Sequence, residues 1–210
     1  NAKFGSSLHS AGDVNNDGIG DVIICAPNFG GGVAYVLFGS SQAFIDIDLA
    51  SFTSGPKGFK MYGAIGDNDA CAVSAAGDLN SDGYGDIIIG AKEANNNNRG
   101  NAYVIFGRGS NFADIDLASF TTSTTNGFVI MGASNNDNLG ASVSSAGDFN
   151  NDGHLDLIVG ATNARSLSGT RNDYGMAYVL FGPHNGASDL DLDGWQTSSG
   201  LGFKIYAESS

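Results

Sequence analysis

The sequence predicts an all-β chain built from three four-stranded blades of a β-propeller. One pattern of short apolar runs occurs three times in tandem, glycine supplies 32 of the 210 residues, and only 15% of the residues are charged. Many glycines and few charges are typical of short strands joined by tight turns. No window keeps a convincing 3.6-residue apolar period, so we expect few helices.

Each repeat carries four strand candidates rich in β-branched and aromatic residues. The stretches that match are residues 10–21, 75–86 and 145–156, then 22–27, 87–91 and 157–161, then 34–39, 102–107 and 177–182, and finally 58–62, 127–131 and 202–206. Four strands at a long fixed period are the signature of a propeller blade. We place the approximate blades at residues 1–63, 64–132 and 133–207 of a single segment, 1–210.

An Asp-rich connection before the fourth strand also repeats, at residues 44–52, 112–120 and 187–195. It ends on an aromatic residue each time: Phe52, Phe120 and Trp195. We favour an aromatic plug that packs the connection onto its blade over a platform for a ligand.

The two ends of the chain continue the same period. If Ser210 were joined to Asn1, the distance from Gly202 to Gly5 would equal that from Gly127 to Gly140. Closed propellers have about four to eight blades, so three blades cannot close. We expect either further blades in a longer chain or association of copies of this chain.

The strongest chemical signal is Asp-x-Asn-x-Asp-Gly-x-x-Asp, which occurs once in each repeat. Oxygens at positions 1, 3 and 5 of a tight loop converge on one point, glycine at position 6 allows the turn, and the position-7 carbonyl and position-9 carboxylate complete a shell. Hard oxygen ligands in a flexible set favour Ca²⁺ over Mg²⁺. The predicted ligands of three structural calcium ions are Asp13, Asn15, Asp17, Ile19 and Asp21, then Asp78, Asn80, Asp82, Tyr84 and Asp86, then Asp148, Asn150, Asp152, His154 and Asp156.

The alternative for these loops is an Asx-rich turn that binds no ion. Three loops in register, each with three aspartates that repel one another without a cation, favour calcium. An EF-hand is disfavoured because the position-12 glutamate is missing and strands flank the loop.

Together with Phe4-Gly5, Leu139-Gly140 and the Gly-Ala pairs at 90–91 and 160–161, the Asp loops resemble FG-GAP repeats, which form the seven-bladed propeller of integrin α subunits. The resemblance covers nearly the whole chain. It implies that each Asp loop joins the first two strands of a blade and holds calcium, and that adhesive contacts come from loops on the opposite face. The chain departs from the family in blade number and in two motif glycines.

The two cysteines stand at those glycine positions. Cys25 replaces the glycine found at Gly90 and Gly160, and Cys71 replaces the one found at Gly5 and Gly140. We favour a Cys25–Cys71 disulfide between blades one and two, which would persist outside the cell. Two buried free thiols are the alternative.

Composition and missing motifs exclude several classes of function. A formal net charge of −13 disfavours nucleic acid and anionic membranes as partners. No apolar run is long enough to insert into a membrane. No histidine lies beside a plausible nucleophile with an orienting acid, and no phosphate loop occurs, so we expect no enzyme activity.

The function we expect is a calcium-stabilised adhesion or structural module that is secreted or displayed on the cell surface. It would bind protein or glycan ligands, self-associate, or form the repeating unit of a fibre or array. The alternatives are a closed lectin-like or receptor propeller and an accessory domain of a secreted hydrolase.

Overall fold

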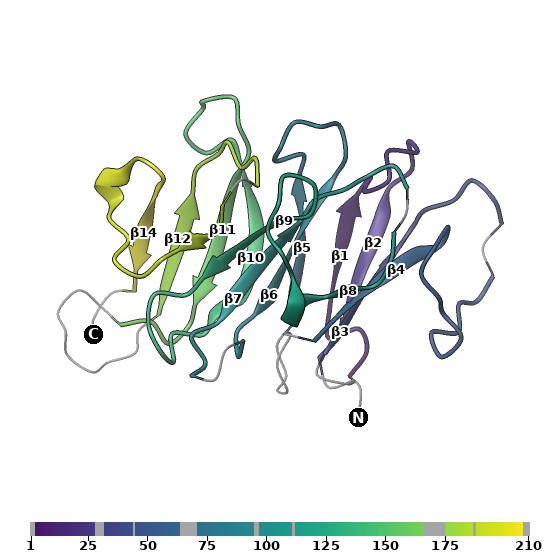
Figure 1. Ribbon diagram of the computed structural model, residues 1–210, viewed down its shortest axis with the longest axis horizontal. Helices are drawn as coiled ribbons and strands as arrows, with labels where there is room; N and C mark the ends of the chain where they lie inside the picture. The colour runs from purple at the N-terminus through teal and green to yellow at the C-terminus, as the bar shows by residue number, and fades with distance from the viewer. Residues whose placement is uncertain are drawn as a thin grey trace.

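The computed structural model describes residues 3–27, 32–43, 45–63, 71–94, 97–110, 112–165, 175–186 and 188–207. Within these ranges the chain forms three β-sheets that stand side by side in a row (Figure 1). The chain ends that would form the seam, and residues 44 and 187 of the connections, lie outside the described residues.

Each sheet contains four antiparallel strands in chain order, which we call blades 1, 2 and 3. This arrangement confirms the predicted all-β blade architecture. Blade 1 contains β1 (Ser7–Gly12), β2 (Asp21–Ala26), β3 (Val33–Leu37) and β4 (Gly58–Tyr62). Blade 2 contains β5 (Ala72–Gly77), β6 (Asp86–Ala91), β7 (Asn101–Ile105) and β9 (Gly127–Met131). Blade 3 contains β10 (Leu139–Gly147), β11 (Asp156–Ala161), β12 (Met176–Leu180) and β14 (Gly202–Tyr206).

The first strand of every blade ends in the same irregularity. The register with the second strand shifts between Ser10 and Gly12, between Ala75 and Gly77, and between Ser145 and Gly147. The glycine at the end has φ of +79°, +78° and +67° in blades 1, 2 and 3. A bulge with a residue in this region bends the strand and redirects the chain, here into the Asp loop.

The core lies between the blades. Blade 2 is covered on both sides, and every residue of β6 and β7 is buried. Two clusters of buried side chains fill the interfaces between neighbouring blades. We call the interface of blades 1 and 2 joint 1–2, and that of blades 2 and 3 joint 2–3. Joint 1–2 includes Val14, Ile23, Val36, Phe59 and Met61 of blade 1 and Val73, Ile87, Ile89, Tyr103 and Leu117 of blade 2. Joint 2–3 includes Leu79, Ile88, Val104, Phe128 and Ile130 of blade 2 and Leu157, Val159, Tyr178, Leu192 and Trp195 of blade 3.

A short strand in the connection ties blade 2 to blade 1 and blade 3 to blade 2. In blade 2 the connection contains β8 (Ile115–Asp116), which pairs in parallel with β4 of blade 1. In blade 3 it contains β13 (Leu190–Asp191), which pairs in the same way with β9 of blade 2. This pairing could not be predicted from the sequence, because two residues are too few to show a strand period.

The aromatic residue that ends each connection packs inward, as the plug hypothesis required. Phe52 and Trp195 are buried, and Phe120 is partly buried. Phe52 meets the Tyr35 ring edge-on at 6.0 Å between centroids, and Phe120 meets Tyr103 in the same way at 5.9 Å. In the described ranges the only helices are two three-residue 3-10 turns, η1 (Leu117–Ser119) and η2 (Thr197–Ser199). None of these described helices could span a membrane.

Candidate metal loops

The three Asp loops join the first two strands of their blades, β1 to β2, β5 to β6 and β10 to β11. Figure 1 shows them on one side of the row of blades, at the top of the view. The resemblance predicted this position within the blade. The position follows from the bulge that ends each first strand, since the bulge occurs at the same point in all three repeats.

The loop is wound around its first aspartate. Asp13 accepts hydrogen bonds from the backbone N–H of Asp17 at 3.0 Å and of Gly18 at 2.8 Å. Asp78 accepts the corresponding bonds at 3.0 and 2.8 Å, and Asp148 accepts them at 3.0 and 3.0 Å. The three loops therefore share one conformation that the position-1 carboxylate stabilises.

Two residues per loop adopt positive φ to make this turn. The position-6 glycines Gly18, Gly83 and Gly153 have φ of +84°, +91° and +88°. Position 4 is Asn16, Ser81 or Asn151, with φ between 53° and 60°. Glycine adopts positive φ without steric cost, and asparagine tolerates it better than most residues.

The side chains at positions 3 and 5 bond to each other. The amide of Asn15 donates to Asp17 at 3.0 Å, and the same contact links Asn80 to Asp82 at 2.9 Å and Asn150 to Asp152 at 2.7 Å. The second oxygen of each position-5 aspartate accepts the N–H of position 7, which is Ile19, Tyr84 or His154. Of these carboxyls, Asp152 has a pKa held below its usual value, mainly by the hydrogen bond from Asn150.

The position-9 aspartates have a structural role beyond the predicted one of metal ligand. Asp21, Asp86 and Asp156 are buried, although the rest of the loop is largely exposed. One oxygen of Asp86 accepts the N–H of Leu79 at 2.7 Å, and the other accepts the N–H of Gly107 at 2.9 Å. Asp21 bonds in the same way to Val14 and Gly39, and Asp156 to Phe149 and Gly182. Each position-9 carboxylate thus binds its loop to a glycine that lies just beyond the end of the third strand.

Burial makes the charge on these aspartates unfavourable. It raises the pKa of Asp86 to about 7, even though two backbone N–H bonds oppose the change, and the charges of Asp82 and Asp78 raise it further. The pKa of Asp21 is raised for the same reasons, with Asp13 and Asp17 as its charged neighbours. A cation in the loop would relieve this repulsion.

The loops carry the oxygen donors that a hard cation requires, but their side chains do not converge on a single point. Within the described ranges, no three acidic, histidine or cysteine side chains lie close enough together to hold a metal ion as they stand. The carboxylates of positions 1, 5 and 9 accept backbone N–H groups, and each carboxylate retains further lone pairs. Those free lone pairs, with the position-3 amide oxygen and the position-7 carbonyl, are the donors that calcium would use.

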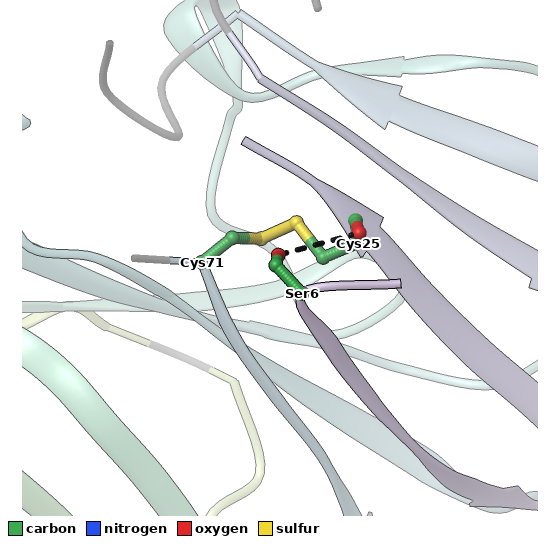
Figure 2. Close-up of a disulfide and its surroundings, with 3 residues drawn as sticks. All are labelled: Ser6, Cys25 and Cys71. Atoms are coloured by element: carbon green, nitrogen blue, oxygen red, sulfur yellow. Dashed lines mark hydrogen bonds between the residues drawn. A yellow bond between two sulfur atoms is a disulfide. The ribbon is translucent and has the colours of Figure 1, made fainter. Parts of the chain in front are cut away.

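A disulfide joins Cys25 of blade 1 to Cys71 of blade 2, with 6.2 Å between their Cα atoms (Figure 2). Ser6, beside it in Figure 2, donates its hydroxyl to the carbonyl of Cys25 at 3.5 Å. The matching positions of joint 2–3 are Gly90 and Gly140. A side chain on Gly90 would lie 2.0 Å from the carbonyl oxygen of Gly140. The two blades therefore approach each other closely at this point in both joints.

The histidines have surroundings that suit structural roles. His184 is buried, stacks on Phe128 with 5.4 Å between ring centroids, and faces the carbonyl of Leu180 at 3.3 Å. Burial lowers its pKa. His9 is exposed and contacts the carbonyl of Ser10.

Comparison with known proteins identifies the repeats. The family model of the FG-GAP repeat matches residues 4–37, 72–105 and 139–180, which together form just over half of the chain. The chain belongs to the FG-GAP repeat family. Each FG-GAP match begins at or shortly before the first strand of a blade and ends with the third strand, so it contains one complete Asp loop.

Several relatives carry similar FG-GAP repeats. The chain is 35% identical to integrin alpha-PS5 of Drosophila melanogaster over 98 residues, which cover 44% of this chain and 9% of that protein. It is 32% identical to integrin alpha pat-2 of Caenorhabditis elegans over 158 residues, which cover 71% and 12%. It is 35% identical to phosphatidylinositol-glycan-specific phospholipase D of Rattus norvegicus over 144 residues, which cover 64% and 16%. The chain thus spans less than a fifth of the length of these relatives.

Proposed function

We propose that this chain is a calcium-stabilised adhesion or structural module that acts outside the cell and binds partners without catalysing a reaction. The observation that carries the proposal is the set of three Asp loops of the same conformation on one side of the blades, each with a buried carboxylate beneath an acidic turn. Calcium in these loops would offset the acidic charge and hold the turn between the first two strands of each blade in one conformation. The disulfide between blades 1 and 2 supports an oxidising location.

The partners that we propose are proteins or glycans. Integrin α chains among the relatives support a protein ligand. The side of the blades opposite the Asp loops would carry the contacts, because the loops there differ among the three repeats while the Asp loops are nearly identical. A fixed scaffold with variable loops is a common arrangement for recognition.

Two finer versions of this function differ in assembly. In the first, copies associate into a fibre or array, and the module is a building block. In the second, the blades belong to a closed propeller that acts as a receptor or lectin-like disc. Electron microscopy in calcium distinguishes fibres with a regular axial repeat from separate rings.

An accessory role in a secreted hydrolase is a second candidate. The match to phosphatidylinositol-glycan-specific phospholipase D favours it, since FG-GAP repeats occur there in a protein named for an enzyme activity. This candidate requires a separate catalytic domain in the same polypeptide. Sequencing the complete gene would reveal that domain.

Thermal unfolding tests the calcium component. A ligand that binds only the native state stabilises it by about 2.7 kcal/mol per site when its concentration is 100 times the dissociation constant. We expect the melting temperature to rise by several degrees in millimolar calcium relative to excess chelator, and magnesium to have a much smaller effect. A melting temperature that is the same with calcium and with chelator would contradict the proposal.

A further inference from the structure

The Asp loops of blades 1 and 2 contact each other directly. We call residues 13–21, 78–86 and 148–156 loop 1, loop 2 and loop 3. The backbone N–H of Gly85, at position 8 of loop 2, donates to the carbonyl of Asp13, at position 1 of loop 1, at 2.8 Å. This hydrogen bond therefore joins two candidate metal loops without passing through the apolar core of joint 1–2.

The peptide group that makes this bond also carries a predicted ligand. The carbonyl of Tyr84, the position-7 donor of loop 2, and the N–H of Gly85 belong to one planar peptide unit. When the carbonyl oxygen binds a cation, the unit is polarised and its N–H becomes a stronger hydrogen-bond donor. The acceptor is Asp13, whose carboxylate shapes loop 1 by accepting the N–H groups of Asp17 and Gly18. Filling loop 2 would therefore fix the residue around which loop 1 is wound.

A second route links the position-9 aspartates of the same two loops. Asp86 accepts the N–H of Gly107 at 2.9 Å. The next residue, Arg108, donates its N–H to the carbonyl of Val14, also at 2.9 Å. Val14 in turn donates its own N–H to Asp21 at 2.8 Å. A shift of either buried carboxylate thus displaces backbone that bonds the other loop.

Loops 2 and 3 lack both links. Position 8 of loop 3 is Leu155, whose side chain lies over the end of β5, where it would collide with a methyl group on Gly77. The residue that corresponds to Arg108 is Pro183, which has no backbone N–H to donate. Among the described residues, no backbone hydrogen bond joins loop 3 to loop 2.

The residue at position 8 determines how closely a loop can approach its neighbour. A methyl group on Gly85 would lie 3.1 Å from both the backbone nitrogen and the carbonyl oxygen of Asp13. A larger side chain there would push loop 1 away and break the hydrogen bond. At Gly20, which is position 8 of loop 1, a methyl group would meet nothing within 4 Å.

We propose that the calcium sites of loops 1 and 2 are positively coupled, so that filling one strengthens binding at the other, whereas the site of loop 3 fills independently of loop 2. The inference rests on the proposed calcium-binding function and assigns a regulation to it. Coupling between two sites is reciprocal and typically changes affinity about 5–150-fold. Loops 1 and 2 would then fill over a narrower range of calcium concentration than loop 3.

Electrostatic repulsion between two bound cations acts against this coupling. Each loop carries three aspartates, so a loop that holds one calcium ion still has a negative net charge. Physiological salt screens charges that are more than about 8 Å apart. The hydrogen bonds between loops 1 and 2 act at contact distance, so we expect their effect to exceed the repulsion.

Nuclear magnetic resonance of the isotope-labelled 210-residue chain follows each site separately. The backbone N–H groups of the position-6 glycines Gly18, Gly83 and Gly153 report loops 1, 2 and 3. Free calcium is set by a chelator buffer in physiological salt, and the concentration that half-saturates each glycine signal is measured. Loop 2 has a neighbouring loop on each side, so Gly83 provides the test and its control in one signal.

Disabling loop 1 with Asp13→Asn and Asp17→Asn should raise the calcium concentration that half-saturates Gly83 by at least about fivefold. The matched control disables loop 3 with Asp148→Asn and Asp152→Asn and should leave Gly83 unchanged. Both variants remove two negative charges from a loop beside loop 2, so a difference between them arises from the contacts and not from charge alone.

Gly85→Leu gives loop 2 the residue that loop 3 carries and keeps every predicted ligand. In this background, disabling loop 1 should no longer change the half-saturation of Gly83. Gly20→Leu is the matched control, and in its background the dependence on loop 1 should persist. Matching circular dichroism spectra in chelator would show that the variants fold. If Gly85→Leu did not fold, the comparison of disabled loops 1 and 3 would still decide the question.

Equal half-saturation of Gly83 with loop 1 intact and loop 1 disabled would overturn the coupling. The calcium component of the proposed function would then stand, because the glycines still respond to calcium. An equal loss of affinity when loop 3 is disabled would overturn the independence of loop 3. If none of the three glycines responded to calcium, the calcium component of the proposed function would fail and the coupling would fail with it.

Discussion

The backbone N–H of Lys60 in blade 1 donates to the carboxylate of Asp114 in the connection of blade 2, at 3.1 Å. The same carboxylate accepts the hydroxyl of Ser54 and lies 3.9 Å from the Lys60 ammonium. Asp189 makes the two corresponding hydrogen bonds to blade 2. In the connections of blades 2 and 3, one aspartate therefore binds the outer edge of the preceding blade.

Replacing this aspartate should weaken the joint. Asp114→Ala leaves the Lys60 N–H and the Ser54 hydroxyl without their acceptor, and loss of hydrogen bonds at such an exposed position costs about 0.5–1.5 kcal/mol. We expect urea denaturation to show a free energy of unfolding lower by about that amount. Asp193→Ala, at an exposed position of the third connection, should change it by less than about 0.5 kcal/mol. Equal stabilities of the two variants would refute the role of Asp114.

The close approach of blades 2 and 3 makes a second prediction. Gly90→Ala would place a methyl group 2.0 Å from the carbonyl oxygen of Gly140, which is backbone and cannot move aside cheaply. We expect a destabilisation of about 3 kcal/mol or more, because overpacking in a core is among the most costly substitutions. Gly20→Ala is the matched control, since a methyl group there meets nothing within 4 Å. Similar melting temperatures for the two alanine variants would argue against this packing.

The disulfide predicts that the protein has no free thiols and that removing the bond lowers its stability. Thiol titration of the denatured, unreduced protein should detect no free cysteine, and finding two thiols would eliminate the bond. Removing a native disulfide typically costs about 2–5 kcal/mol. The double variant Cys25→Gly with Cys71→Gly should show this loss while keeping the glycine pair that joint 2–3 already accommodates at Gly90 and Gly140.

The raised pKa of Asp86 predicts an unusual pH dependence of stability in the absence of divalent cations. Its pKa is about 7 in the folded chain and near 3.8 when exposed, so between these values the folded state binds more protons than the unfolded state. Stability contributed by this group is therefore present at low pH and is lost as pH rises from about 4 to 7. Other acidic groups on the surface also make the free energy of unfolding depend on pH. The contribution of Asp86 is therefore obtained by comparison with a variant that lacks its carboxylate.

Asp86→Asn isolates that contribution. In chelator, we expect the parent chain to lose more stability than the variant between pH 4 and pH 7, measured by urea denaturation. Added calcium should reduce the difference, because a cation offsets the charge on the parent carboxylate. Parallel pH profiles of parent and variant in chelator would show that Asp86 keeps an ordinary pKa.

The sequence predicted the parts of this structure that are local and repeated. The Asp loops and the strands around them follow from residue spacing, because glycine and the Asx residues determine the turn and apolar residues form the strands beside it. The plug positions Phe52, Phe120 and Trp195 could be found because an aromatic residue recurs at one register.

The contacts between blades could not be derived in this way. A two-residue strand such as β8 has no period, and the residues of β4 that pair with it lie 54 positions earlier in the chain. The only signal was the Asp-x-Asp-Leu pattern repeated in all three connections, which indicated importance but not the partner. The anchoring role of Asp21, Asp86 and Asp156 was hidden for a related reason, since Gly39, Gly107 and Gly182 are distant in sequence.

Counting bound calcium tests the central claim most directly. The chain would be stripped with chelator, dialysed against micromolar calcium in physiological salt, and analysed for metal per polypeptide. We predict three calcium ions per chain, and two for the variant in which Asp78 and Asp82 are both changed to Asn. A count near zero for the parent chain, or the same count for parent and variant, would contradict the assignment of calcium to these loops.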